Sequence, residues 1–320
     1  MQPQDVRFNN ESPRSVPQKA GIVVKPSAGE TPLRILMFVI AAILWIAFIV
    51  SVIGLVYGIM LGVFFFFAHL ILIAHVRGSS VKLGPQQMPA LYNRAVDIAQ
   101  RIGMKKTPDV YLQQSGGVLN AFATRFGRRR FVVLYSDLVK ACGDNLDALD
   151  FIIGHELGHI HRGHLNWRWL LAPAMFIPFL GTAYSRACEY TCDRYGFQAP
   201  SDPNRSLDGL CVLAAGPQFV PYVNRQAFVA QRDDLNTAFM KLGTWFSTHP
   251  PLSRRVAALA PNLDLETHGS ATATFGALLM AFVLFAVPVA GGAFVIKQAA
   301  ADFTKKISAQ TGIAGGTYRR

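Results

Sequence analysis

The residues His155-Glu156-Leu157-Gly158-His159 could bind a metal ion and use it for hydrolysis. Two histidines four positions apart share one face of an α-helix, so both imidazoles can reach a single Zn²⁺ ion. The carboxylate of Glu156 stands beside them, where it can accept a proton from a water molecule that the metal activates. The motif therefore predicts a zinc-dependent hydrolase with one Zn²⁺ per subunit. His155 and His159 are expected as ligands and Glu156 as the general base; the alternative is a helix with two incidental histidines.

The third metal ligand must come from outside this motif. A metzincin would have a histidine at position 165, where this chain has leucine. On a continuing helix, His161 and His164 would both point away from the ligand face. Of the five glutamates in the chain, two precede the first long apolar region, one is Glu156 and one adjoins the last apolar region. This elimination favours Glu189 as the third ligand, with a surface helix face as the alternative.

Asp193 and two cysteines surround Glu189 in the sequence. Asp193 lies one helical turn after Glu189, where its carboxylate can accept a hydrogen bond from a ligand imidazole. Cys188 and Cys192 are four positions apart, which is also typical of a metal-binding pair. Because they flank Glu189, they cannot all point at one ion, and we interpret both cysteines as small buried side chains.

Three apolar segments surround these residues. Residues 35–76 contain no Asp, Glu, Lys or Arg over 42 positions, about twice the length of one membrane span, and predict two transmembrane helices that turn near Ser51 and Gly54. Residues 267–296, interrupted by Pro288, predict a kinked span or a re-entrant element. Residues 169–185 lie between His159 and Glu189. Because these two predicted ligands must lie on the same side of the membrane to bind one metal, the segment between them cannot cross the membrane once. The residues of this segment are too few to cross it twice, and we expect them to dip in and return, to lie at the interface, or to be buried in protein.

Composition excludes several classes of protein. Hydrophobic residues make up 51% of the chain and charged residues 16%, which excludes an intrinsically disordered protein. Four cysteines in 320 residues cannot form a disulfide framework. The net charge is +12, and much of the excess Lys and Arg flanks the apolar segments. The positive-inside rule then predicts that the N-terminal region and the domain after the hairpin face the cytoplasm. We interpret the basic run at 125–130 as a solvated or lipid-facing loop, so no nucleic acid is expected as a partner.

Periodicity predicts an α+β fold that is mostly helical with a small β-sheet. Helical spacing covers residues 91–102, 146–164 and 226–246, and short strands are predicted at 110–112 and 131–135. The predicted organisation is a polar basic N-terminal tail, two transmembrane helices, a metallopeptidase domain, a C-terminal membrane segment and a basic tail. Their boundaries are 1–34, 35–76, 77–266, 267–296 and 297–320.

Four motifs in this order resemble those of the HtpX/CaaX prenyl endopeptidase family of integral-membrane zinc metallopeptidases. The resemblance extends over about residues 77–259 and the N-terminal hairpin. It rests on N-A-F-A at 120–123, the zinc helix at 155–159, R-x-x-E-x-x-x-D at 186–193, and T-H-P-P-x-x-x-R at 248–255. Cys192 stands where the family usually has alanine. Proteins closely related to HtpX have two membrane spans between the zinc helix and the helix of the third ligand, and this chain lacks them. The difference indicates that the chain belongs to a neighbouring branch of the family.

The resemblance implies roles for individual residues. It implies that His155, His159 and Glu189 bind zinc, as in gluzincins, and that Glu156 is the general base. It further implies that the segment of Asn120, Ala121 and Phe122 presents its backbone to an extended substrate. His249 and Arg255 would lie near the cleft. A histidine at position 249 could donate to the oxyanion of the tetrahedral intermediate, with a structural turn before Pro250 as the alternative.

The expected function is that of a membrane-bound zinc endopeptidase whose partners are polypeptide substrates and the lipid bilayer. By resemblance, the substrates are membrane or unfolded proteins in quality control. The expected location is a multi-pass membrane position, in the cell inner membrane if the source is bacterial. The alternatives are a narrow-specificity processing protease of the prenyl-peptide type and a catalytically silent zinc-binding chaperone or scaffold. The sequence predicts no oligomeric state.

Overall fold

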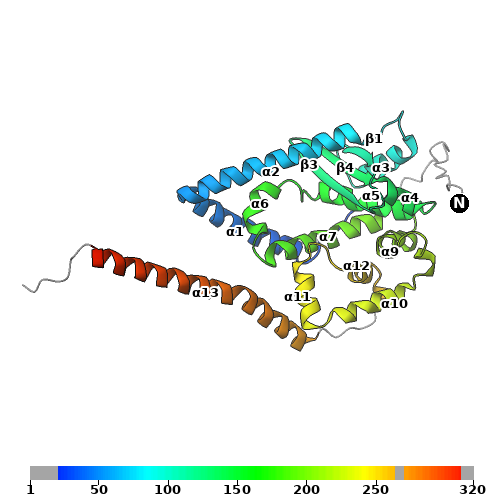
Figure 1. Cartoon of the computed structure of the whole chain (residues 1–320). Helices are drawn as coiled ribbons and strands as arrows, with labels where there is room; N and C mark the ends of the chain where they lie inside the picture. Colours follow the sequence, from blue (N-terminus) through cyan, green and yellow to red (C-terminus); the bar gives the residue numbers. More distant parts are fainter. Residues whose placement is uncertain (1–20, 264–269, 311–320) are drawn as a thin grey trace, which may run out of the picture. The chain divides into compact units, whose positions relative to one another are not determined.

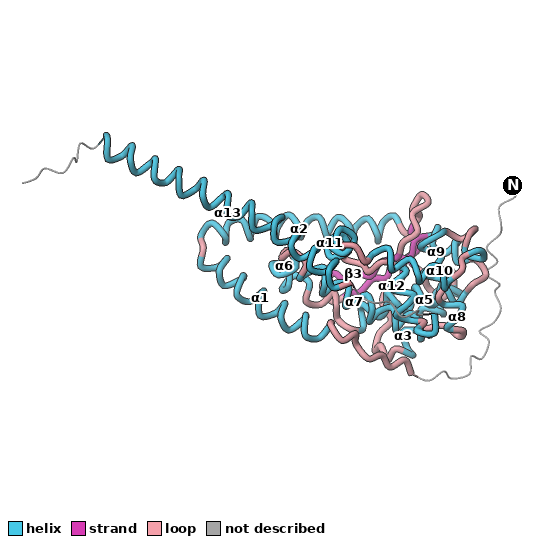
Figure 2. The backbone as a smooth tube through the Cα atoms, turned by 90° about the horizontal axis from the view of Figure 1, so that it is seen from below, coloured by secondary structure: helices cyan, strands magenta, loops and turns pink. Residues whose placement is uncertain are grey.

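A computed structural model describes residues 21–263 and 270–310 of the chain. The described backbone is mostly helical, and its strands are confined to one region (Figures 1 and 2), which confirms the predicted α+β class with a small sheet. The chain divides into two compact units. Of the described residues, the larger unit holds 21–233 and 245–263, and the smaller unit holds 234–244 and 270–310.

The larger unit begins with a helical hairpin of α1 (Glu30–Val50) and α2 (Val52–Ser79) (Figure 1). The turn falls at Ser51, whose extended backbone ends α1 and whose hydroxyl accepts a hydrogen bond from the Gly54 N–H at 3.1 Å. Most large apolar side chains of the hairpin are exposed, as expected for helices that face lipid. The first helix begins at Glu30, before the predicted boundary at residue 35.

The sheet has four strands in the order β1-β2-β4-β3. Their bounds are Val81–Lys82 for β1, Asp109–Gln113 for β2, Ala121–Phe126 for β3 and Arg129–Tyr135 for β4. The central pair β2 and β4 is parallel, while β1 and β3 pair antiparallel at the two edges. The basic run at 125–130 is the β3–β4 hairpin, and Gly127 at its turn has φ +57°. The sequence analysis predicted the central strands and missed both edge strands: β1 has only two residues, both exposed, and β3 has six residues, of which only one is fully buried.

Helix α5 (Leu146–His161) lies at the centre of the larger unit and packs most extensively against α7 (Leu180–Gln198). Apolar residues on nearly every face of α5 are buried, because neighbouring elements surround it. Around these two helices lie α3 (Pro89–Arg101), α4 (Ser136–Cys142), α8 (Pro203–Ser206), α9 (Asp208–Ala215) and α12 (Leu252–Leu259). Ile22 and Val24, in the segment before α1, are buried in the same core.

The segment 169–185 packs against α1. It forms α6 (Arg168–Met175), a break near Phe179 and the beginning of α7. The indole N–H of Trp45 in α1 donates to the carbonyl of Leu170 at 2.8 Å. Met37 of α1 is fully buried in one apolar cluster with Leu171 and other residues of α6 and α7. This short segment is therefore held beside the first helix of the hairpin.

Residues 226–246, predicted as one helix, are divided into three elements. These are α10 (Arg225–Ala230), a 3₁₀ helix at Gln231–Leu235 and α11 (Ala238–Phe246). The prediction of one helix was wrong because polar side chains that compete for backbone hydrogen bonds lie between its two ends. For example, the Thr237 hydroxyl accepts from the Met240 N–H at 3.4 Å. Two further 3₁₀ turns lie at Val220–Tyr222 and Pro261–Leu263.

The smaller unit contains the long helix α13 (Ala271–Gln310). Its first turn is capped by the Ser270 hydroxyl, which accepts from the Ala273 N–H at 3.1 Å. Pro288 lies inside the helix, and the helix continues past the predicted boundary at 296 through an alanine- and lysine-containing stretch. Among the described residues, three helices are long and apolar enough to cross a membrane: Glu30–Val50, Val52–Ser79 and Ala271–Ile307.

Candidate metal centre

The three predicted ligands meet between α5 and α7. His155 and His159 lie one turn apart on α5, with 3.3 Å between their Nε2 atoms. From α7, Glu189 places Oε2 at 3.4 Å from Nε2 of His155 and Oε1 at 3.3 Å from Nε2 of His159. One ligand atom from each residue lies within 4.8 Å of the others. The structure therefore brings residues 155, 159 and 189 together around one point.

Glycines allow α5 and α7 to approach each other closely. A Cβ atom on Gly154 would stand 2.6 Å from the Cβ of Ala199, and a Cβ on Gly196 would stand 2.6 Å from the carbonyl oxygen of Phe151. Neither distance is possible for real Cβ atoms, so the two helix backbones are in contact at these positions. Since His155 directly follows Gly154, this contact sets the distance between the histidine ligands and Glu189.

Asp193 and Arg255 lie on the Nδ1 side of the His155 ring, away from the predicted metal position. Nδ1 of His155 donates to Oδ1 of Asp193 at 3.0 Å, which leaves Nε2 of the same ring free for a metal. Arg255 donates to both carboxylate oxygens of Asp193 through Nε, at 2.9 Å, and Nη2. Asp193 is 1% exposed and Arg255 6%. Arg255, expected near the substrate cleft, is thus buried in an ion pair with the carboxylate that contacts His155, a predicted ligand.

The electrostatics of the site favour a cation between the ligand atoms. Burial by itself would lower the pKa of His155, but its contacts with Asp193 and Glu189 raise it to about 10. Burial would raise the pKa of Glu189, but both ligand histidines lower it well below its usual range. The Arg255 guanidinium also keeps the pKa of Asp193 low against the effect of burial. The paired carboxylates therefore create a negative potential at the His155 ring, which stabilises either a proton or a metal ion there.

The donor set fits a catalytic zinc ion. Two histidines and one carboxylate are a common set in zinc hydrolases, which leave a further coordination position for water or substrate. Within the described chain, the buried Oε2 atom of Glu189 has no hydrogen-bond partner. A buried carboxylate oxygen without a partner is costly, and a metal ligand bond would satisfy it. Glu156, beside the first ligand, is 8% exposed.

His249 lies at the open side of the same site. Its side chain is 64% exposed, and its Nε2 atom is 3.5 Å from Oε1 of Glu189. The loop that carries it is held by Arg186, which donates to the carbonyl oxygens of Trp245, at 2.9 Å, and Ser247, at 2.7 Å. Arg186 comes from the R-x-x-E-x-x-x-D motif, so the helix that carries the predicted third ligand also holds the His249 loop.

Asn120, Ala121 and Phe122 lie at the start of the outer strand β3. The Asn120 carbonyl accepts from the Tyr135 N–H at 3.1 Å, so the segment is paired to β4 on one side. Asn120 is exposed, while Ala121 and Phe122 are half-buried. Strand β3 also packs against α5, the helix that carries two of the ligands.

His164 is a neighbour of the site that the sequence analysis assigned to the wrong face. The prediction assumed a helix through residue 164, but α5 ends at His161 and Gly163 turns the chain with φ +75°. His164 therefore returns to the ligands, with its Nδ1 atom 3.1 Å from Nδ1 of His159. Glycine just after the helical pattern was the available signal. His164, His159 and Cys192 also form a second group that could hold a metal.

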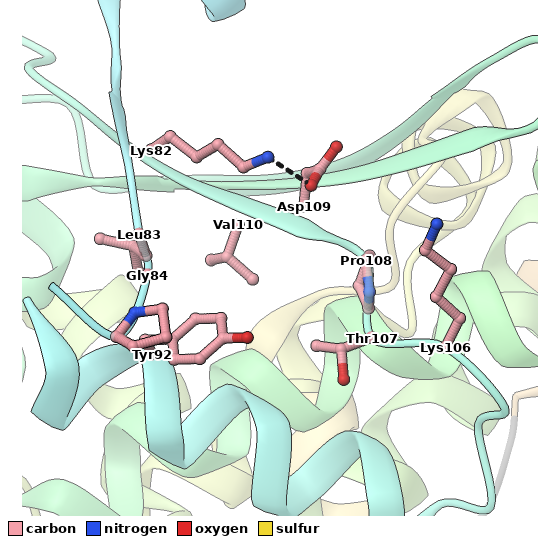
Figure 3. Close-up of a pocket in the computed structure, with 10 residues that line it drawn as sticks. Lys82, Leu83, Gly84, Tyr92, Lys106, Thr107, Pro108, Asp109 and Val110 are labelled. Carbon is pink, nitrogen blue, oxygen red and sulfur yellow. Dashed lines mark ion pairs between the residues drawn. The ribbon is translucent and has the colours of Figure 1, made fainter. Parts of the chain in front are cut away.

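A separate cavity of about 590 Å³ is lined by residues of β1, by the start of β2 and by the segment that precedes β2 (Figure 3). Its lining includes Lys82 and Asp109, whose side chains form an ion pair at 2.7 Å. None of the predicted site residues lines this cavity. Its position therefore gives it no part in the metal centre.

The sequence profile of peptidase family M48 matches residues 85–176 and 166–262. The two matches together extend over more than half of the 320 residues and include every residue of the metal centre described above. No curated protein and no solved structure matches the chain.

Proposed function

The chain belongs to peptidase family M48, and on this premise we propose that it is a membrane-bound, zinc-dependent endopeptidase. The observation that carries the proposal is the convergence of His155, His159 and Glu189, with Glu156 adjacent on the same helix. Family M48 is zinc-dependent, and the donor set in this chain is one that zinc hydrolases use.

The chemistry divides between the ion and the protein. When bound, a zinc ion polarises the carbonyl of the scissile peptide bond and lowers the pKa of water. Glu156 accepts the proton of the attacking water and then donates it to the amine leaving group. Asp193 fixes the proton of His155 on Nδ1, because an ionised carboxylate can only accept a hydrogen bond and Nδ1 is the ring nitrogen that faces it. Arg255 in turn fixes the orientation of the Asp193 carboxylate.

Substrate is proposed to bind as an extended peptide along β3. An outer strand can add a further strand through backbone hydrogen bonds, and the segment from Asn120 to Phe122 begins such a strand. His249 is proposed to donate to the oxyanion of the tetrahedral intermediate. Its exposed imidazole next to Glu189 supports this role, because a substrate carbonyl could reach both the metal centre and this ring.

The membrane placement is part of the same proposal. Three helices of suitable length and apolar composition support a multi-pass protein, and the basic flanks of the hairpin support a catalytic domain that faces the cytoplasm. We propose membrane or unfolded proteins as substrates, in quality control, as in the HtpX-like enzymes that the motifs resemble.

The experiment that tests the mechanism replaces Glu156 with Gln in the full chain in detergent. Cleavage of an unfolded model protein should fall by about 10² to 10⁴-fold, while bound zinc, measured by elemental analysis, stays at the wild-type level. Asp97→Asn, which changes a carboxylate that is 46% exposed on α3, is the matched control and should cleave normally. Undiminished cleavage by Glu156→Gln with zinc retained would refute the role of Glu156. A wild-type protein that binds zinc but cleaves nothing would instead indicate a scaffold.

A further inference from the structure

Glu30, the first residue of α1, is buried beside the metal centre. Its side chain is fully buried, although it lies at the start of an apolar helix whose other large side chains are mostly exposed. Oε1 of Glu30 accepts from Nη2 of Arg162 at 2.9 Å and lies 3.4 Å from Nε2 of His164. The sequence analysis set this glutamate aside because it precedes the apolar hairpin. The fold brings it to a histidine that contacts a metal ligand.

His164 connects Glu30 with His159. The side chain of His164 is 6% exposed, and its two ring nitrogens face different partners. Nε2 faces Glu30, and Nδ1 lies at hydrogen-bond distance, 3.1 Å, from Nδ1 of His159. The other nitrogen of His159, Nε2, faces Glu189 and His155. The four side chains therefore form a continuous series from Glu189 to Glu30.

The placement of protons in this series follows from imidazole chemistry. A neutral imidazole carries one proton, so His159 can offer Nε2 to a metal only if its proton is on Nδ1. That proton must then be accepted by Nδ1 of His164. Because His164 uses Nδ1 as an acceptor, its own proton is on Nε2, which faces the Glu30 carboxylate. In this arrangement the proton of His164 lies on the side of Glu30 Oε1, which is 3.4 Å from Nε2, and Nε2 of His159 is free as a ligand.

We propose that Glu30 and His164 are positioning residues that hold His159 in its metal-binding tautomer and orientation. The inference rests on the proposed function, since it concerns the same zinc centre. It gives the two histidine ligands equivalent support: Asp193 contacts His155 directly, and Glu30 acts on His159 through His164. Partners of this kind fix the tautomer and ring orientation of metal ligands in other zinc sites.

The segment before α1 holds Glu30 in place. The Ile22 N–H donates to the Arg101 carbonyl at 2.7 Å, and the Ser27 N–H donates to the Thr191 hydroxyl at 2.8 Å. Arg194 of α7 donates to the carbonyl of Lys25 at 2.8 Å. These contacts fasten residues 22–27 to the helices of the catalytic domain, so the carboxylate reaches His164 from a fixed backbone.

A second metal at His159, His164 and Cys192 is the competing reading of the same geometry. Sγ of Cys192 lies 3.6 Å from Nδ1 of His164. In that reading both nitrogens of His159 would bind metal, which requires an imidazole with no proton at all. The series from Glu189 to Glu30 needs only neutral rings, and it also accounts for the Glu30 carboxylate 3.4 Å from Nε2 of His164.

The experiment measures Zn²⁺ affinity and stoichiometry of the full chain in detergent, by competition with a chromophoric chelator. His164→Phe keeps the ring shape without nitrogens, and Glu30→Gln removes the charge with little change in shape. Each variant should bind Zn²⁺ about 10 to 100-fold more weakly than the wild type. The double variant should lose little more than the stronger single variant, because both act through one series. Lys82→Ala, which changes an exposed side chain on β1 that has no contact with the series or the segment before α1, should keep wild-type affinity.

The outcomes separate this inference from the function on which it rests. One tightly bound Zn²⁺ in the wild type and unchanged affinity in both single variants would refute the role of Glu30 and His164 alone. Affinity losses that multiply in the double variant would also refute it, because they would indicate independent structural damage. Two Zn²⁺ per chain, with one lost in His164→Phe, would establish the second metal site instead. A wild-type chain that binds no Zn²⁺ would overturn the proposed function itself.

Discussion

Replacing Gly154 with alanine should separate α5 from α7 and weaken the metal centre. The new Cβ would stand 2.6 Å from the Cβ of Ala199, 3.1 Å from the Tyr195 carbonyl oxygen and 3.2 Å from the Cα of Gly196. Carbon atoms in contact lie about 3.5–4.0 Å apart. The atoms nearest the new methyl group are backbone or Cβ atoms, which cannot rotate away. The helices must therefore move apart by about 1 Å at this position.

The expected effect on stability and activity follows from that displacement. Overpacking of a close-packed core costs about 1–3 kcal/mol of unfolding free energy. Metal ligand distances tolerate only about 0.2 Å, so a shift of about 1 Å between His155 and Glu189 cannot be absorbed at the ion. A misplacement of about 1 Å at a reacting centre can lower the rate about 10²-fold. Gly154→Ala should thus reduce kcat/KM by about 10²-fold and lower zinc affinity as well.

The assay combines peptide cleavage, zinc titration and thermal unfolding of the same preparation. Gly78→Ala, in α2, is the matched control, because a Cβ at that position meets nothing within 4 Å. The control should be neutral or slightly stabilising, since alanine favours helix over glycine by about 1 kcal/mol. Wild-type zinc affinity and cleavage in Gly154→Ala would refute the argument that backbone contact at this position sets the ligand distances.

Three further predictions concern buried charged or ionisable groups. Arg255→Ala leaves the Asp193 carboxylate buried without its guanidinium partner, which should lower the unfolding free energy by about 3–5 kcal/mol; an unchanged thermal midpoint would contradict the assignment of a buried pair. In chelator-treated protein, the pKa of His155 is raised to about 10. Binding of the proton to His155 therefore stabilises the fold fully below about pH 6.5, and this stabilisation is lost as the pH rises through about 10. The thermal midpoint of that form should fall between pH 7 and pH 10, and a flat profile would argue against the Asp193 and Glu189 contacts as the cause. Burial raises the pKa of Cys142 to about 12, so native protein at pH 8 should show no alkylation of this thiol by iodoacetamide in mass spectrometry; rapid labelling would show that the residue is not buried in solution.

Local periodicity predicted much of the fold but misplaced the ends of its elements. The hairpin, α5 and the central strands follow from runs of apolar residues that are independent of the rest of the chain. The break in residues 226–246 and the end of α5 before His164 were missed. At both places the chain leaves the helix because a glycine turn or a polar side chain offers the backbone other conformations or hydrogen bonds. The periodicity of apolar residues carries no information about these local alternatives.

The sequence by itself determined the reactive part of the site. His155, Glu156 and His159 are close in space because they are close along one helix, and Glu189 could be chosen because the chain has few glutamates. Only the tertiary structure decided what surrounds them. Glu30 and Arg162 are 132 positions apart, and Asp193 and Arg255 are 62 apart. Contacts over such separations depend on how α1, α5, α7 and α12 pack, and packing is set by shape and burial across the whole domain rather than by spacing within one segment.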